Sequence, residues 1–192
     1  MIAIIKYNAG NIRSVQNALD RLGYESKVTD DIKEIRAADK VIFPGVGEAG
    51  SAMKYLKEHK LDICIKSLKQ PVLAICLGLQ LMCKYSEEGK TECLGIFDAN
   101  VKAFPPEDIV PHMGWNNFTR IKDEIFTGIK LENDVYFVHT YYATLSENTI
   151  AESNYILPFS AAMKSGNFYA TQFHPEKSAE VGEQILKNFL QL

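Results

Sequence analysis

Few cysteines and histidines occur in this chain, and their spacing fits neither a disulfide framework nor a metal site. The 192 residues include four cysteines and four histidines. No two cysteines form a C-x-x-C pair, and no histidine has a ligand-spaced partner. We therefore expect no disulfide, no bound metal and no resident cofactor, with Cys64, Cys83 and Cys93 as reduced residues in or near the core.

The sequence also lacks long apolar runs and a strong charge of either sign. The formal net charge is −3, which gives no electrostatic basis for binding nucleic acid or a membrane surface. No segment approaches the length of a membrane span, and the run from Met1 to Ile5 predicts a strand rather than a signal peptide. We expect a cytoplasmic protein that binds neither nucleic acid nor membrane.

Apolar runs instead alternate with helical patterns, which predicts a mixed α/β fold. Because the apolar runs are nearly continuous, we expect a largely parallel central sheet flanked by helices, followed by short β runs that extend it and add a small antiparallel layer. No repeat, low-complexity stretch or linker interrupts the chain, so residues 1–192 are expected to form one domain. The predicted strands are 2–5, 25–28, 41–43, 72–75, 118–121, 135–139, 150–152, 160–163 and 168–173. The predicted helices are 11–22, 32–37, 48–57, 61–68 and 179–192. Asn11 is expected to cap the first of these helices, and Gly23 is expected to end it.

Cys76 lies where one of these strands passes without a spacer into a helical segment, in the run Val72-Leu73-Ala74-Ile75-Cys76-Leu77-Gly78-Leu79-Gln80. This pattern is typical of a nucleophile elbow, where a strained turn exposes the nucleophile and the next backbone N–H faces the oxyanion. A helix N-terminus favours the reactive thiolate. Ala74 stands where the pattern usually has its first glycine. Alone, the pattern fits a buried structural cysteine equally well, because free cysteine is among the most buried residue types.

A second signal lies near the other end of the chain, where a strand-like run delivers His174 and Glu176 at its exit. A cysteine nucleophile needs a base to move its proton, and that base needs a group to orient it. Alone, His174 could be a strand-end histidine and Glu176 a favourable charge ahead of the last helix. Together with Cys76 they indicate a Cys-His-Glu catalytic triad.

The two motifs resemble those of the class I (triad) glutamine amidotransferases, whose fold is flavodoxin-like. Further runs resemble the glutaminase subunits of imidazole glycerol phosphate synthases, and this resemblance extends from the first strand to the last helix. One departure is Lys6-Tyr7-Asn8-Ala9, which replaces the usual Asp-Tyr-Gly. The runs that carry the resemblance are Gly10-Asn11-Ile12-Arg13-Ser14-Val15, Pro44-Gly45-Val46-Gly47, Pro111-His112-Met113-Gly114-Trp115-Asn116, Phe137-Val138-His139-Thr140-Tyr141 and His174-Pro175-Glu176-Lys177-Ser178.

The resemblance implies hydrolysis of L-glutamine to glutamate and ammonia, with the ammonia passed to a partner (β/α)8-barrel cyclase. That cyclase would convert a ribulosyl-formimino carboxamide ribonucleotide into imidazole glycerol phosphate and an aminoimidazole carboxamide ribonucleotide, in histidine biosynthesis. Cys76 would attack the glutamine side-chain amide, His174 would protonate the departing ammonia and then activate water, and Glu176 would orient His174.

The oxyanion formed in this reaction needs two hydrogen-bond donors. We expect the Leu77 N–H to be one and the Val46 N–H to be the other, because the glycines on both sides of Val46 permit a peptide flip. A simple turn after a strand would also explain the Pro-Gly pair. The resemblance further implies substrate contacts from Gly47, Gln80, Glu88, Thr140 and Tyr141, with Glu88 accepting the ammonium group and the 139–141 backbone contacting the carboxylate.

Three residues are expected at the interface with the cyclase: Asn11, Trp115 and Lys177. A cation at a helix start is slightly unfavourable, so a partner carboxylate is a better explanation for Lys177 than solvent exposure. Trp115 could otherwise be a buried aromatic beside a turn, Gln80 an exposed helix residue and Glu88 a solvated surface charge.

Four alternatives remain open at this stage. The chain could be the amidotransferase subunit of anthranilate, guanylate or pyridoxal phosphate synthesis, or a peptidase or γ-glutamyl hydrolase that acts without a partner. It could be a catalytically silent scaffold for a barrel protein, or a paralogue that supplies ammonia to another acceptor, for instance in surface-sugar synthesis. Glutamine assays with and without a cyclase separate the partnered enzymes from the others.

Overall fold

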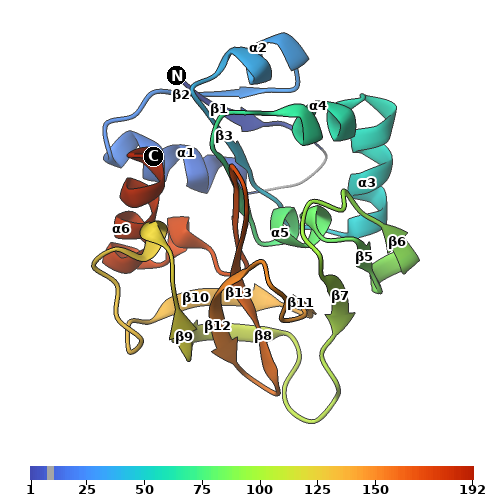
Figure 1. Cartoon of the computed structure of the whole chain (residues 1–192), viewed down its shortest axis with the longest axis vertical. Helices are drawn as coiled ribbons and strands as arrows, with labels where there is room; N and C mark the ends of the chain where they lie inside the picture. The colour runs from blue at the N-terminus through green and yellow to red at the C-terminus, as the bar shows by residue number, and fades with distance from the viewer. Residues whose placement is uncertain (8–10) are drawn as a thin grey trace.

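A single eight-stranded mixed sheet organises the computed structural model, which describes residues 1–7 and 11–192. Its strand order is β2-β1-β3-β4-β14-β13-β12-β9, and Figure 1 shows helices on both sides of its upper part and a strand-rich region below. This confirms the expected fold class. The strands of the large sheet are β1 (Ile2–Ile5), β2 (Ser26–Thr29), β3 (Lys40–Phe43), β4 (Val72–Ile75), β9 (Arg120–Ile121), β12 (Thr149–Asn154), β13 (Pro158–Ser165) and β14 (Phe168–Thr171).

The first five strands of this order are all parallel. Among them, β1 and β4 are wholly apolar and buried because both of their faces are covered. Successive residues of β1 and β4 point alternately into two hydrophobic clusters, one on each face of the sheet. One cluster contains residues of α2 to α5, and the other contains residues of α1 and α6. The α-helices are α1 (Ile12–Arg21), α2 (Ile32–Ala37), α3 (Ala49–Glu58), α4 (Leu61–Ser67), α5 (Leu77–Met82) and α6 (Ala179–Leu190).

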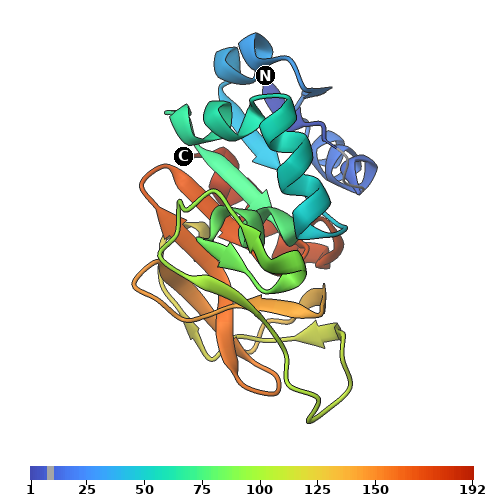
Figure 2. The same cartoon turned by 90° about the vertical axis from the view of Figure 1, so that its right-hand side faces the viewer.

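The other part of the large sheet is antiparallel, from β14 through β13 and β12 to β9. Two smaller sheets, rather than one antiparallel layer, accompany the large sheet: β10-β8 is antiparallel and β11-β7-β5-β6 is mixed. The β10-β8 sheet lies in the lower half of Figure 2. The strands of the two smaller sheets are β5 (Tyr85–Ser86), β6 (Thr91–Glu92), β7 (Asn100–Ala103), β8 (His112–Asn116), β10 (Val135–His139) and β11 (Tyr141–Ala143), and the 3-10 turns are η1 (Glu88–Lys90), η2 (Glu124–Phe126) and η3 (Pro175–Lys177).

The start of α1 differs from expectation. Asn11 precedes the helix in a left-handed conformation with φ 70°, but its side chain makes no capping bond and instead donates to Glu176 Oε1. The predicted side-chain cap is therefore wrong, because a capping residue needs an extended backbone to aim its side-chain oxygen at the first turn, and Asn11 is left-handed. Part of the Lys6-Tyr7-Asn8-Ala9 departure, together with Gly10, lies outside the described residues.

Three functional motifs meet because of strand order. β4 lies between β3 and β14 in parallel pairing, so the three carboxyl ends share one edge of the sheet. The Pro44 to Gly47 loop follows β3, Cys76 follows β4, and His174 comes shortly after β14. This edge is where open α/β sheets bind their ligands.

A close approach at Gly78 locks the turn after β4 against β3. A Cβ atom on Gly78 would lie 2.2 Å from the Phe43 carbonyl oxygen and 3.3 Å from the Ala74 Cβ. Because the Phe43 oxygen belongs to the backbone of a buried strand, it has little freedom to move away. The Ala74 methyl group adds a second close contact, so residue 78 has room for a side chain on neither side.

We predict that Gly78→Ala lowers the free energy of unfolding by about 3 kcal/mol, the upper end of the cost of overpacking a core. Gly166→Ala is the matched comparison, since Gly166 has φ +58° but no atom within 4 Å of its would-be Cβ. Its cost should be limited to about 1 kcal/mol of left-handed backbone strain. Urea denaturation measures both variants, and equal destabilisation would contradict the packing argument.

Candidate active site

Cys76 has the backbone geometry of a strained elbow. Its φ of 54° and ψ of −108° fall outside the usual regions for an L-residue, and such strain concentrates at functional sites. The Cys76 N–H donates to the Thr171 carbonyl at 2.7 Å, which joins the turn to β14. The sulfur lies 3.8 Å from the Val138 carbonyl oxygen, so the thiol can donate there.

His174 and Glu176 form the acid-base half of the predicted triad. His174 Nδ1 lies 2.8 Å from Glu176 Oε1, and both side chains are buried. That contact fixes the tautomer, because the carboxylate accepts and Nδ1–H donates, which leaves Nε2 for the reaction. His174 Nε2 is buried without a hydrogen-bond partner among the described residues.

Charge holds His174 in its protonated form. Burial by itself would lower the pKa of His174, but the nearby Cys76 sulfur and the hydrogen-bonded carboxylate of Glu176 outweigh burial and raise it. The arrangement therefore favours the protonated imidazolium form of His174. A thiolate–imidazolium pair supplies both the nucleophile and the proton for a leaving amine.

The Gly45–Val46 peptide is oriented opposite to what the predicted oxyanion hole requires. The Leu77 N–H donates to the Gly45 carbonyl at 3.2 Å, so one expected donor is already occupied. Because that carbonyl belongs to the Gly45–Val46 peptide, the peptide presents its oxygen to Leu77 rather than its N–H to a substrate. An oxyanion hole from Leu77 and Val46 therefore requires this peptide to flip, as expected from the flanking glycines.

A pocket of about 260 Å³ opens beside Cys76. It brings together all of the residues expected to form the oxyanion hole and to bind substrate, whereas His174 and Glu176 do not line it. Four further residues complete the wall: Pro111, Val138, His139 and Cys76 itself. The expected set lining the pocket is Val46, Gly47, Leu77, Gln80, Glu88, Thr140 and Tyr141.

Gln80 and Glu88 have defined contacts here, so the surface interpretations of both are wrong. Gln80 is buried, and its Nε2 donates to the Tyr141 carbonyl at 2.9 Å. Glu88 is half-buried and Oε2 accepts from the Ala49 N–H at 2.8 Å, at the start of α3. Burial raises the pKa of Glu88, the Ala49 bond opposes this rise and the charge of Glu48 adds to it.

Comparison with known proteins identifies the family. The family described as glutamine amidotransferase class-I matches residues 3–192. The imidazole glycerol phosphate synthase subunit HisH of Bacteroides fragilis is 61% identical, with 100% of this chain and 99% of that protein covered. The subunit of the same name from Haemophilus influenzae is 44% identical over 99% of this chain and 96% of its own length. The chain is a class I glutamine amidotransferase of the HisH family.

Solved structures of amidotransferases share the fold. A glutamine amidotransferase from Thermotoga maritima has a TM-score of 0.67 at 17% identity, covering 99% of this chain and 82% of that one. The glutaminase domain of Trypanosoma brucei CTPS, solved with bound acivicin, has a TM-score of 0.62 at 14% identity, covering 99% and 93%. The full-length HisH relatives favour this subfamily over anthranilate, guanylate or pyridoxal phosphate enzymes, and over a silent scaffold.

Sequence reasoning missed several polar residues that support the amidotransferase site. Ser178 donates to the His174 carbonyl at 2.7 Å and accepts from the Tyr136 N–H at 2.9 Å, which fixes the His174 backbone against β10. Gln172 lies between Cys76 and Gln80. Both residues lie within or beside the His-Pro-Glu-Lys-Ser motif, so the motif was a signal for them.

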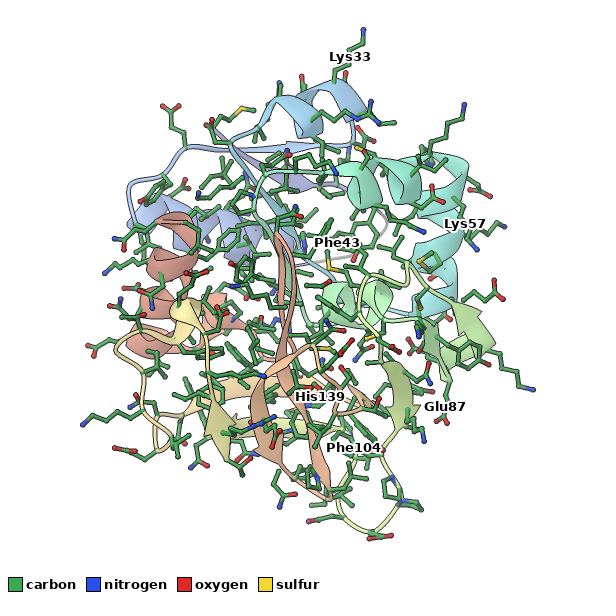
Figure 3. All side chains as sticks on the ribbon, viewed as in Figure 1. Lys33, Phe43, Lys57, Glu87, Phe104 and His139 are labelled. Carbon is green, nitrogen blue, oxygen red and sulfur yellow. The ribbon has the colours of Figure 1, made fainter. Side chains whose placement is uncertain are left out.

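A buried pair of neutral histidines supports the pocket wall. His112 Nδ1 lies 3.0 Å from His139 Nε2, and His139 Nδ1 lies 2.8 Å from the Tyr141 carbonyl. Burial lowers the pKa of His112 to about 4 and is the main cause that lowers the pKa of His139 to about 3. Phe104 packs on His139 with ring centroids 5.3 Å apart, and Figure 3 labels both in the strand-rich region.

The three expected interface residues lie in different settings. Trp115 is 55% exposed on β8 and packs edge-on against Tyr136, so the buried-aromatic interpretation is wrong. Lys177 is exposed in η3, next to Glu176. Asn11 is half-buried and reaches the triad carboxylate. Their contact with a partner stays a prediction.

Membrane spans and metal clusters do not occur in the described part of the chain. Within residues 1–7 and 11–192, no helix is long and apolar enough to cross a bilayer. In the same described ranges, no three His, Cys, Asp or Glu side chains are grouped to hold a metal ion. All four cysteines are free thiols, and Cys64 and Cys83 are buried as expected.

The neutral histidine pair generates a pH prediction. Because the folded pKa of His139 lies below its unfolded value, unfolding takes up a proton, and the free energy of unfolding falls as pH drops from about 6.5. One such histidine contributes up to about 1.4 kcal/mol per pH unit. In denaturation experiments between pH 6.5 and 5, the free energy of unfolding of His139→Gln should fall less steeply with decreasing pH than that of the native chain. An unchanged slope would contradict the neutral assignment.

Proposed function

We propose that the chain is the glutaminase subunit of an imidazole glycerol phosphate synthase, hydrolysing L-glutamine with Cys76, His174 and Glu176. The observation that carries this proposal is the convergence of an elbow cysteine and a buried His-Glu pair at the ends of adjacent strands, beside a pocket. HisH relatives of nearly equal length support the same assignment. We further propose that residues 1–192 act as one domain, supported by the eight-stranded sheet with a core on each face.

The proposed mechanism has two half-reactions. Cys76 Sγ attacks the side-chain carbonyl carbon of glutamine, and the carbon–nitrogen bond breaks as His174 gives its Nε2 proton to the departing ammonia. His174, now neutral, takes a proton from water, whose oxygen attacks the thioester and releases glutamate. Glu176 keeps His174 oriented through Nδ1 and stabilises each imidazolium.

Substrate binding is proposed to use the polar edge of the pocket. Glu88 would accept the ammonium group of glutamine through Oε1, because its Oε2 already accepts from Ala49. Gln80 would contribute Oε1, because its Nε2 contacts Tyr141 and Gln172. Gly47 and the backbone of Thr140 and Tyr141 complete the wall around the substrate.

The ammonia acceptor is proposed to be a (β/α)8-barrel cyclase that makes imidazole glycerol phosphate and an aminoimidazole carboxamide ribonucleotide, in a cytoplasmic heterodimer. The exposed Trp115 and Lys177 offer it an aromatic surface and a cation near the triad. Asn11, bonded to Glu176, would connect that interface to the triad. A paralogous acceptor remains the alternative, and transfer to the cyclase in vitro distinguishes the two.

Replacing the nucleophile should separate the two activities. We predict that Cys76→Ala lowers glutamine-dependent product formation by at least about 10³-fold, the scale of losing a triad member. The cyclase supplied with ammonium salts should still turn over in the presence of this variant, because it has its own active site. Spectroscopic assay of the imidazole product measures both rates.

Cys93→Ala is the matched control, since Cys93 is a half-buried free thiol that does not line the pocket. It should retain glutamine-dependent synthesis. Persistent glutamine hydrolysis by purified Cys76→Ala would rule out the proposed nucleophile.

We also propose that partner binding completes the oxyanion hole. The bond from the Leu77 N–H to the Gly45 carbonyl stabilises the inactive peptide orientation in the isolated chain. Flipping that peptide frees the Leu77 donor and adds the Val46 donor, so the cyclase and its nucleotide must stabilise the flipped orientation preferentially. Glutamine hydrolysis would thereby be coupled to the demand for ammonia.

The isolated chain should therefore be a poor glutaminase. One missing oxyanion donor costs a factor of roughly 10² to 10³ in rate. We predict that glutamate release rises in order for the chain alone, the chain with cyclase, and the complex with the cyclase nucleotide. Val46→Pro, which removes the N–H, should lose most of the stimulated rate while still assembling with the cyclase. Val46→Ala, which keeps the N–H, should retain the stimulated rate. Equal rates under all three conditions would defeat the gating proposal.

A further inference from the structure

Gln172 connects Cys76 to the substrate pocket through buried amides. It follows β14, and its N–H continues the pairing with β13 by donating to the Ala161 carbonyl at 2.8 Å. The side chain is 0% exposed. Its Nε2 lies 3.8 Å from Cys76 Sγ, and its Oε1 lies 3.2 Å from Gln80 Nε2.

The hydrogen-bond pattern fixes which way each amide faces. The Tyr141 carbonyl can only accept, so the group of Gln80 that lies 2.9 Å from it must be the NH2. That NH2 also faces Gln172, which must therefore turn its oxygen toward Gln80. The NH2 group of Gln172 is then directed at the sulfur, and the reverse orientation would set two NH2 groups against each other.

The other neighbours of the sulfur act in different directions. The Val138 carbonyl, at 3.8 Å, can only accept a hydrogen bond from the thiol and so favours the protonated form. His174 favours the anion, because it holds the proton that the sulfur gives up. Tyr7 is buried beside this turn, and its pKa is raised mainly by burial and further by Cys76, so it stays neutral.

An amide N–H has the opposite effect to the Val138 carbonyl. It can only donate, and a thiolate is a stronger acceptor than a thiol. We propose that Gln172 stabilises the thiolate of Cys76 by donating this hydrogen bond, with Gln80 holding the Gln172 amide in the donating orientation. The inference rests on the proposed role of Cys76 as nucleophile and adds a residue to the catalytic site.

Alkylation of Cys76 by iodoacetamide tests the proposal on the full-length chain. The thiolate attacks the reagent, a sulfur–carbon bond forms and iodide leaves, so the rate follows the thiolate population without requiring glutamine or the cyclase. Peptide mapping by mass spectrometry assigns the reaction to Cys76 among the four cysteines. Rates are measured from pH 5 to 10.

Two variants remove the donor in different ways. Gln172→Met replaces the amide by an apolar chain of similar length, and Gln172→Glu keeps an acceptor for Gln80 but sets a carboxylate against the sulfur. For Gln172→Met we expect about tenfold slower alkylation of Cys76 at neutral pH and a pH profile shifted up by about one unit. The Gln172→Glu variant should be slower still, because like charges repel.

Thr171→Val is the matched control for structural disturbance. Thr171 is the neighbouring buried residue, and its hydroxyl bonds only the Phe173 carbonyl among the described groups, at 2.9 Å. This variant should lose stability in thermal denaturation and keep the native pH profile of alkylation, whereas a purely structural role for Gln172 would leave all profiles alike.

The outcomes separate this inference from the proposed function. Folded Gln172→Met and Gln172→Glu variants could show the native pH profile of alkylation, with Cys76 still the fastest cysteine to react. That result would overturn the role of Gln172 and leave the assignment of Cys76 as nucleophile intact. A native chain in which Cys76 reacts no faster than Cys93 would overturn both.

Discussion

Parallel pairing of β4 with both β3 and β14 is the constraint on which the site depends. It brings Cys76 beside a loop some thirty residues earlier and a histidine nearly a hundred residues later in the chain. The hydrogen bond from the Cys76 N–H to the Thr171 carbonyl continues this pairing into the strained turn. Backbone strain at a single residue persists only where the surrounding structure holds that residue in place. Here the close packing of Gly78 on Phe43 helps to hold the strained turn at Cys76.

The same packing leaves several buried polar atoms without partners. Tyr7 Oη, His174 Nε2 and Glu176 Oε2 make no hydrogen bond within the described part of the chain. Such groups cost stability, and they persist at sites where function requires them. His174 Nε2 has an evident use, since it faces the proposed proton transfer. Tyr7 Oη lies where a Cβ on Gly45 would be 2.1 Å away, so the hydroxyl leaves no room for a side chain at the peptide that we propose to flip.

Much of the parallel half was predictable from the sequence because its strands are buried on both faces. Runs such as Ile2–Ile5 and Val72–Ile75 carry no polar residue, and no other secondary structure of that length suits them. The predicted edges are off by one or two residues, as at the strand β2 and at the end of the helix α6. Strands β5 to β8 were not predicted because they are short or interrupted by glycine and polar residues.

The site was predictable only as far as its motifs extend. The triad residues lie in recognisable runs, whereas the contact of Gln172 with Cys76 joins residues 96 positions apart and follows from strand order alone. The Asn11 contact with Glu176 spans 165 positions, and local helix-capping rules predicted a different partner for it. Long-range polar contacts leave no periodic signal, so sequence patterns cannot assign them.

Two buried histidines near the site, His174 and His139, differ in protonation state, and the charge of one favours the neutral form of the other. His174 is held as a cation by anionic neighbours, while His139 is held neutral, in part because a second positive charge so near His174 would be repelled. Neutral His139 can then donate from Nδ1 to the Tyr141 carbonyl, which also accepts from Gln80 Nε2. Both lone pairs of that carbonyl are used, so it offers nothing further to a ligand. In the proposed binding mode, where the substrate carboxylate contacts the backbone of this wall, the two donors on the Tyr141 carbonyl reduce the repulsion that its oxygen would otherwise exert on that carboxylate.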